Sequence, residues 1–394
     1  MRRVPERDLT ASGSGRISEG KGRHSFRTER WKDRITYFGK KYKVKKIYRI
    51  LIFGLAVSFF YGLVVSQSCG QKMQQYQGQF FDCFDTVTTI TGYARSQKDF
   101  SEKMELLQNK LMYYHQLYDI YHTYDGINNL KSINDAAGKK PLKVDTEIIK
   151  LLKLGREMYD KTEGKLQITY GSVLSLWHEY REKGMEQPQK AELPPKKELD
   201  RRAGHTDMEK LILDEEASTV YLADKNMSLD VGSIGKGYAV QRLAEYAREI
   251  GMEHALISVG GNVCAVGAKP EGEPWTVGVE NPDYDSSQPY VCAVELADQS
   301  IVTSGDYQRY YEVDGVRYCH IIDPETNMPP EYFTSVSVIT KDSGMADALS
   351  TSLFNMDYDT GLSLVESITD VEAMWIGKDG KIRCSSGFKY NETK

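Results

Sequence analysis

Asp230-Val-Gly-Ser-Ile-Gly-Lys-Gly237 joins a predicted strand to a helix predicted at 237–250. That helix is the one helical segment within a long run of short, alternating stretches that read as strands. The predicted strands are 211–213, 219–222, 254–259, 275–280, 292–296, 335–340, 373–376 and 381–384. Consecutive strands with few helices between them indicate an α+β fold rather than a doubly wound parallel sheet.

Upstream of this run, the sequence predicts one strand and two helices. The β-branched stretch 84–90 is typical of a strand. A second helix is expected at about 145–162, ending before Gly164, since glycine is the preferred residue after a helix end. The charged stretch 183–206 contains three prolines and is expected to run over the surface. The first of the two helices precedes the one at 145–162 and is amphipathic. Its apolar stripe is Met104, Leu107, Leu111, Tyr114, Leu117 and Tyr121.

The N-terminal part of the chain differs in charge from the remainder. Residues 1–49 carry 16 Lys and Arg against 5 Asp and Glu, a net charge of about +11, so the rest of this chain of net charge −5 carries about −16. An acidic body does not suggest nucleic-acid binding. Residues 50–65 then form a run of sixteen residues without a charge. A basic flank before an apolar run of this length suits a signal peptide or a short membrane anchor.

These features divide the chain into four parts. We expect a disordered cytoplasmic arm at 1–49, a signal peptide or membrane anchor at 50–69, a Gln-rich tether at 70–79 and one folded domain at 80–394. Cys69 directly follows the apolar run, so it could carry a lipid after cleavage, or the anchor could stay uncleaved. Both alternatives put the folded domain at the extracytoplasmic face of the cell membrane.

The turn 230–237 also carries chemistry. Its three glycines let the backbone approach a ligand closely, and the following helix N-terminus offers free N–H groups to an anion. Lys236 adds a positive charge. The spacing is not that of a P-loop, and glycine turns before helices are common without any ligand.

Two further segments combine polar side chains. His320-Ile-Ile-Asp-Pro-Glu-Thr326 brings an imidazole, a carboxylate and a hydroxyl within seven residues. Ala346-Asp-Ala-Leu-Ser-Thr351 puts Asp347 and Thr351 at i and i+4, one above the other on a helix face. Such oxygen ligands suit Mg²⁺ beside a phosphate. No CxxC or His-rich spacing is present, so a zinc or iron–sulfur site is not expected.

Taken together, these segments resemble the flavin transferases of the ApbE type, which move FMN from FAD onto a threonine of a partner protein. The resemblance covers about 80–388 and implies an α+β, ApbE-like fold of T-fold-type mixed sheets with packed helices. The segments that carry it are Phe84-Asp-Thr-Val-Thr-Thr, Gly164-Lys-Leu-Gln-Ile-Thr-Tyr-Gly171, Leu176-Trp177, Asp230 to Gly237, Val259-Gly-Gly-Asn262, Thr303-Ser-Gly-Asp-Tyr307, His320 to Thr326 and Ala346 to Thr351.

The resemblance implies a Mg²⁺-dependent reaction of FAD with an exported or membrane electron-transfer protein, giving FMN-protein and AMP. It implies that Asp347, Thr351 and the backbone carbonyl of Ser233 hold the metal. His320 would activate the acceptor threonine, because an imidazole can accept a proton near neutral pH; alternatively, it orients Asp323. The residues implied to bind FAD are Thr86, Asn128, Asn129, Leu130, Gln167, Asp230, Lys236, Ile322, Asp323 and Thr326.

Two positions depart from the family pattern. Leu166-Gln167 stands where Phe-Asp is usual, so an amide replaces a carboxylate expected near the flavin. Asn327 stands where a glycine is usual, and asparagine tolerates the left-handed backbone conformation better than most residues. The Gln167 departure keeps open an exported FAD-binding lipoprotein that transfers nothing. A third alternative is an FAD pyrophosphatase, in which water replaces threonine.

Overall fold

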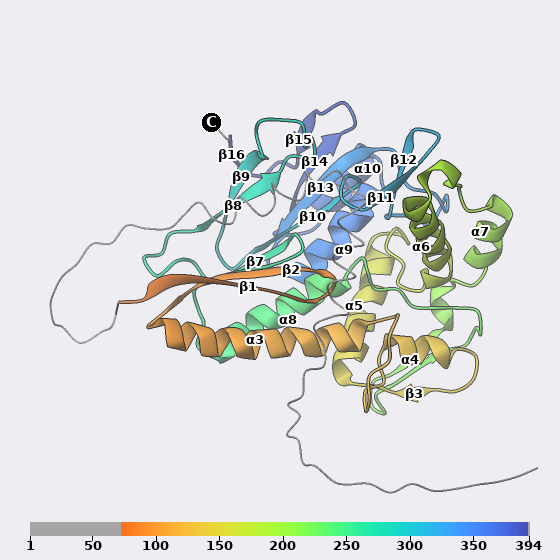
Figure 1. Ribbon diagram of the computed structural model, residues 1–394, viewed down its shortest axis with the longest axis horizontal. Coiled ribbons are helices and arrows are strands. Elements are labelled where there is room, and N and C mark those ends of the chain that lie inside the picture. The colour runs from red at the N-terminus through yellow and green to blue at the C-terminus, as the bar shows by residue number, and fades with distance from the viewer. Residues whose placement is uncertain (1–71, 393–394) are drawn as a thin grey trace, which may run out of the picture. The chain divides into compact units, whose positions relative to one another are not determined.

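The computed structural model describes residues 72–392 (Figure 1). The expected arm 1–49, the segment 50–69 with Cys69, and the first two residues of the expected tether lie outside the described residues. Within the described part, no helix is both long enough and apolar enough to cross a membrane.

An eight-stranded sheet forms the centre of the fold, and each neighbouring pair of its strands is antiparallel. In spatial order its strands are β1 (Gln74–Cys83), β2 (Thr86–Ala94), β6 (Ala255–Val259), β7 (Asn262–Val266), β10 (Ser300–Gly305), β13 (Phe333–Thr340), β14 (Glu372–Gly377) and β15 (Ile382–Cys384). An antiparallel sheet with separate helices confirms the predicted α+β class.

Helices cover one face of this sheet, and a small second sheet covers the other. Successive residues of a strand point to opposite faces. On β14, Ala373 and Trp375 accordingly pack into the helix-side core, while Met374 and Ile376 pack against the small sheet. The helices are α3 (Gln97–Tyr118), α5 (Thr146–Lys161), α8 (Gly235–Glu249), α9 (Ser343–Phe354) and α10 (Tyr358–Glu366). The small sheet comprises β8 (Trp275–Glu280), β9 (Tyr290–Leu296) and β16 (Asn391–Glu392).

The remaining elements form two smaller groups. The first comprises the three-stranded sheet of β3 (Leu142–Lys143), β5 (Thr219–Leu222) and β4 (Leu211–Asp214), with α4 (Leu130–Asp135). The second comprises α6 (Gly171–Glu186), α7 (Lys196–Ala203) and the hairpin of β11 (Tyr310–Val313) and β12 (Val316–Cys319). Short 3-10 turns at Pro188–Lys190 and Met208–Lys210 complete the described chain.

Most expected elements are confirmed within a few residues, and four expectations need correction. Helix α8 is not the one helix among the later strands, because α9 and α10 lie between β13 and β14. β1 begins at Gln74, inside the expected tether, because an edge strand needs only backbone pairing with β2 and can leave its glutamines in solvent. The strand expected from 84 begins at Thr86, because Phe84 and Asp85 have positive φ in the turn before it. The expected surface stretch 183–206 contains α7, whose Leu199 is buried.

Candidate active site

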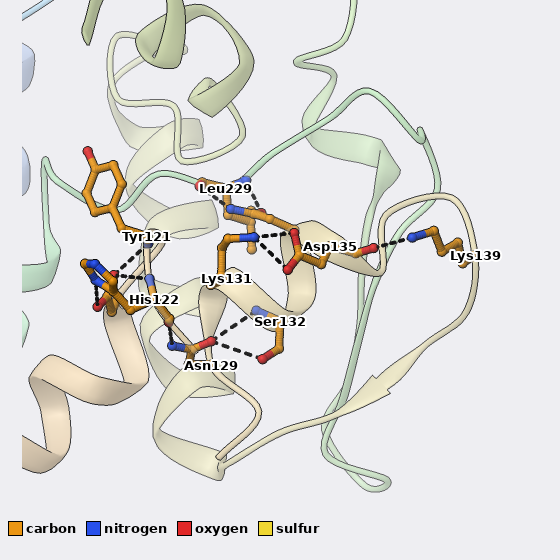
Figure 2. A network of polar contacts seen from close by, with 10 residues as sticks. Tyr121, His122, Asn129, Lys131, Ser132, Asp135, Lys139 and Leu229 are labelled. Atoms are coloured by element: carbon orange, nitrogen blue, oxygen red, sulfur yellow. Dashed lines mark hydrogen bonds and ion pairs between the residues drawn. The ribbon is translucent and has the colours of Figure 1, made fainter. Parts of the chain in front are cut away.

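The glycine turn lies between β5 and α8 and is fixed by contacts from two directions. Asp230 N donates to Ile168 O at 2.9 Å. The Asn134 side-chain amide holds both backbone groups of Leu229, accepting from its N–H at 2.7 Å and donating to its carbonyl at 3.0 Å (Figure 2). Within the turn, Asp230 Oδ1 accepts from Gly232 N at 2.8 Å. Desolvation raises the pKa of Asp230, against the lowering effects of that hydrogen bond and of the His178 and Arg181 charges.

The turn leads into the N-terminus of α8, which meets α9 at Asp347. Gly237 N donates to Asp347 Oδ2 at 2.7 Å, and Lys236 Nζ lies 3.8 Å from the same oxygen. The Asp347 residue is 3% exposed. Desolvation therefore raises its pKa, although Lys236, the Gly237 N–H and the Asn262 amide each oppose that shift. Helix α8 has no side-chain cap, but Gly235 N donates to Val231 O at 2.7 Å and Gly237 N to Asp347, so in its first turn the Lys236 N–H is the one left for a ligand.

The oxygen atoms available near Asp347 fit Mg²⁺. Thr351 lies one turn further along α9, with its Oγ1 3.3 Å from Ser304 Oγ, and Ser233 belongs to the turn that precedes α8. Residues 72–392 contain no group of three or more His, Cys, Asp or Glu that could hold a metal. One carboxylate, a hydroxyl and a carbonyl would therefore need substrate oxygens to complete the shell, which is how Mg²⁺ usually binds. Asn262 is buried beside this carboxylate, and its amide is one of the groups that oppose the rise in the Asp347 pKa.

His320 directly follows β12 and contacts the residue before β11. Its backbone N–H donates to Arg309 O at 3.0 Å, and its Nδ1 lies 3.2 Å from the same oxygen. Desolvation of this partly buried ring, together with the charges of Arg309, Arg181 and Lys236, lowers the pKa of His320 to about 3. The imidazole is thus neutral at pH 7. We assign its proton to Nδ1, donating to Arg309 O, which leaves the Nε2 lone pair available as a proton acceptor.

Asp323 has other partners than His320. Its Oδ1 accepts from Lys165 Nζ at 3.0 Å and from Glu325 N at 3.1 Å. No hydrogen bond joins Asp323 to His320 in the described structure, so nothing there supports the alternative in which His320 orients Asp323. Thr326 Oγ1 instead accepts from Met328 N at 3.3 Å and shapes the same turn.

The asparagine that replaces a glycine keeps the turn. Asn327 has φ of +60°, which confirms that it adopts the left-handed conformation. Its Oδ1 accepts from Tyr170 OH, and its carbonyl accepts from Trp177 Nε1 at 3.0 Å. Ile322 is buried in the same cluster as Tyr170 and Trp177. The segment that carries His320 is therefore held against α6 by contacts with Tyr170 and Trp177.

The other predicted FAD-binding residues mostly bond to the chain itself. Gln167 Nε2 donates to Thr206 O at 2.5 Å. Asn129 is buried and caps α4 through Ser132 N, and its amide donates to His122 O (Figure 2). The same amide donates to Gln116 O. Asn128 Nδ2 donates to Lys143 O, and Leu130 is a core residue. For these four residues, contact with FAD stays a prediction.

Thr86 lies under the β6–β7 turn. A Cβ on Gly260, whose φ is +53°, would come within 2.5 Å of Thr86 Oγ1. The same turn leads into Asn262, which lies near Asp347. The structure thus links Thr86, through this turn, to the Asp347 region.

The sequence did not single out Arg181, and the structure adds it to the site. Arg181 lies on α6 with its guanidinium 2.7 Å from His178 Nδ1, and its charge acts on both Asp230 and His320. Residues 179–186 carry several other charges, so no spacing signal distinguishes this arginine.

Comparisons with known proteins point to one family. The model of the ApbE family matches residues 84–375. An FAD:protein FMN transferase of Klebsiella pneumoniae is 32% identical over 264 residues, which cover 66% of this chain and 78% of that protein. The solved ApbE protein of Thermotoga maritima is 28% identical with a TM-score of 0.71, covering 82% of this chain and 100% of that one. The flavin transferase ApbE of Vibrio cholerae is 26% identical with a TM-score of 0.65, covering 80% and 98%.

Proposed function

The chain belongs to the ApbE family, and on that premise we propose that it transfers FMN from FAD to a threonine hydroxyl of a target flavoprotein and releases AMP. The observation that carries the proposal is the junction of Lys236, Gly237 and Asp347, with the neutral imidazole of His320 near the Lys236 charge. An anion site and a proton acceptor are the two parts that such a transfer needs.

The first role of these residues is to bind the pyrophosphate of FAD. The Lys236 N–H at the uncapped N-terminus of α8 and the Lys236 ammonium would offer this anion a hydrogen-bond donor and a positive charge. Asp347, Thr351 and the Ser233 carbonyl would hold Mg²⁺, which, when bound, neutralises charge on the phosphate oxygens. Thr326 and Ile322 would line the flavin pocket.

The second role is proton transfer. His320 Nε2 accepts the proton of the threonine hydroxyl as its oxygen attacks the phosphorus atom of the FMN half. The bond between that phosphorus and the bridging oxygen breaks, and AMP leaves with the bridging oxygen. The low pKa of His320 then favours release of the captured proton to solvent.

We also propose where the reaction occurs and with what partner. The basic arm and apolar segment before residue 70 support a domain held at the extracytoplasmic face of the membrane by an anchor or by a lipid on Cys69. The acceptor is then an exported or membrane electron-transfer protein.

Nucleotide products separate the proposed transfer from its alternatives. The protein is incubated with FAD and Mg²⁺, with and without a threonine-bearing flavoprotein acceptor, and the nucleotides are separated by chromatography. Transfer predicts AMP that appears only with the acceptor and without free FMN. Equal amounts of free FMN and AMP without acceptor would indicate the pyrophosphatase, and no AMP in either sample would indicate the FAD-binding lipoprotein. Asp347→Ala is the inactive control.

A further inference from the structure

Arg181 and Arg309 lie side by side, although 128 positions separate them in the sequence. Helix α6 packs on β11, and the contact is so close at Gly184 that a Cβ there would lie 2.6 Å from Tyr311 Cδ2. Arg181 is three residues before Gly184, on the same side of the helix. Arg309 is two residues before Tyr311, on the same face of the strand.

His320 shares that face. The hydrogen bond from His320 N to Arg309 O continues the β11–β12 pairing, in which Tyr311 stands opposite Tyr318. Side chains of opposed residues lie on the same face of an antiparallel pair. The Tyr318 ring stacks on Trp177 of α6, with 6.4 Å between ring centroids, so this face of the hairpin is the one turned towards α6. Arg181, Arg309 and His320 therefore converge.

Neither arginine has a counter-charge in contact. Among residues 72–392, no carboxylate forms an ion pair with Arg181 or Arg309, whereas Arg201, Arg202, Arg242 and Arg248 all form one. Arg181 is half-buried and Arg309 is exposed. Desolvation lowers the pKa of Arg181, and the nearby Arg309 charge lowers it further, while the charges of Tyr121, Glu182 and Asp230 act in the opposite direction without forming an ion pair. Two adjacent guanidinium groups without an ion-paired carboxylate repel one another, and a bound anion would relieve that repulsion.

We propose that Arg181 and Arg309 together bind the phosphate that stays with FMN, on the His320 side of the bond that breaks. The inference rests on the proposed transfer and adds two binding residues to it. A guanidinium pair suits this group, because each guanidinium can donate two hydrogen bonds to one phosphate. This assignment gives each phosphate of FAD its own binding residues. The arginine pair would hold the FMN phosphate, and Lys236 with the α8 N-terminus, which lie at Asp347, would hold the phosphate that leaves with AMP.

Binding of half-substrates tests the assignment without relying on turnover. Dissociation constants for FMN and riboflavin are measured by flavin fluorescence, and those for AMP and adenosine by calorimetry. The proteins are the wild type, Arg181→Gln, Arg309→Gln and the surface control Arg248→Gln, each checked for a cooperative melting transition well above the assay temperature. We expect the wild type to prefer FMN over riboflavin. That preference should fall about tenfold in each site variant, the loss expected for a hydrogen bond to a charged group, and stay unchanged in Arg248→Gln.

The remaining outcomes decide against the assignment. A wild type that binds FMN and riboflavin equally would overturn it. The assignment would also be overturned if the site variants lost the preference for AMP over adenosine instead. The arginines would then bind the AMP phosphate of FAD. If the site variants lost transfer but kept the preference for FMN over riboflavin, Arg181 and Arg309 would instead be residues that bind the acceptor protein. Failure of the wild type to modify any acceptor, with the arginine-dependent preference intact, would reject the transfer but keep the phosphate site.

Discussion

Gly237 and Asp347 join the two helices that form the site: the Gly237 N–H donates to Asp347 Oδ2 at 2.7 Å. The approach is close enough to require glycine, because a Cβ at position 237 would lie 2.2 Å from the Ser343 carbonyl oxygen and 2.4 Å from Asp347 Cβ. Helix packing and carboxylate placement are therefore one feature of the fold.

Gly237→Ala should consequently destabilise the protein and stop FMN transfer. The clash is with backbone and with a Cβ, neither of which can rotate away, so α8 and α9 must separate. Overpacking of this kind costs about 1–3 kcal/mol. Urea unfolding measures the loss. Gly235→Ala is the matched control, because its Cβ would meet only the Val231 side chain, whose nearest atom, Cγ2, lies at 3.1 Å. Equal stability of the Gly237→Ala and Gly235→Ala variants would contradict the packing argument.

Asp347→Asn should raise the melting temperature at pH 7.5 in EDTA while abolishing transfer. Its pKa in the folded protein is raised by desolvation, so the folded state favours the protonated form. The stability contributed by that proton is present at low pH and is lost as pH rises through the folded pKa. The neutral amide avoids this loss, and the gain over wild type should shrink at pH 4.5. Thermal unfolding at both pH values is the measurement.

Asp298→Asn provides a control of opposite sign. Burial alone would raise the pKa of Asp298, but the Arg248 guanidinium and the Gly267 N–H outweigh that effect and lower it. Its ionised form is thus favoured by folding, and its amide variant should melt below wild type at pH 7.5. If both variants shifted in the same direction, the pKa of Asp347 would not be the cause.

Transfer should keep its rate from pH 7 down to about pH 5.5 at saturating Mg²⁺. The pKa of His320 is lowered to about 3, so the imidazole stays an unprotonated base throughout that interval. A histidine of ordinary pKa, about 6.5, would lose roughly tenfold in rate across it. The pH profile of kcat/KM for the acceptor tests this, and an inflection near pH 6.5 would show that His320 is not shielded as described.

Asn327 variants should rank in a fixed order of stability, with wild type above Asn327→Gly and Asn327→Gly above Asn327→Ala. Glycine adopts the φ of +60° without strain but loses the hydrogen bond from Tyr170, a cost of about 1 kcal/mol. Alanine loses the same bond and adds roughly 1–2 kcal/mol of left-handed strain. Urea unfolding should resolve the three. An alanine variant as stable as the glycine variant would show that the backbone here is unstrained.

The sequence predicted those parts of the site in which local pattern determines geometry. The i and i+4 spacing of Asp347 and Thr351 survives on α9, and the glycine turn does precede α8. It could not predict that Gly237 donates to Asp347, because helix–helix contacts depend on tertiary packing. Arg181 was missed for the same reason: only the packing of α6 on β11 brings it to His320.

Strand content was predicted less completely than the helices near the site. The edge strand β1 is rich in glutamine and lacks the apolar alternation that marks a strand, yet backbone pairing with β2 suffices to form it. Asn129 shows the converse limit. The family resemblance implies that this side chain binds FAD. In the structure its oxygen caps α4, and its amide nitrogen donates to His122 O.

The intact mass of the acceptor protein tests the central claim most directly. A purified flavoprotein acceptor is incubated with FAD, Mg²⁺ and the protein, then analysed by mass spectrometry beside an acceptor whose threonine is replaced by valine. We predict one FMN added through a phosphoester to the wild-type acceptor, none on the valine acceptor, and none with Asp347→Ala or His320→Ala enzyme. An unmodified acceptor in the presence of bound FAD, or an FMN adduct that persists without the threonine, would contradict the account.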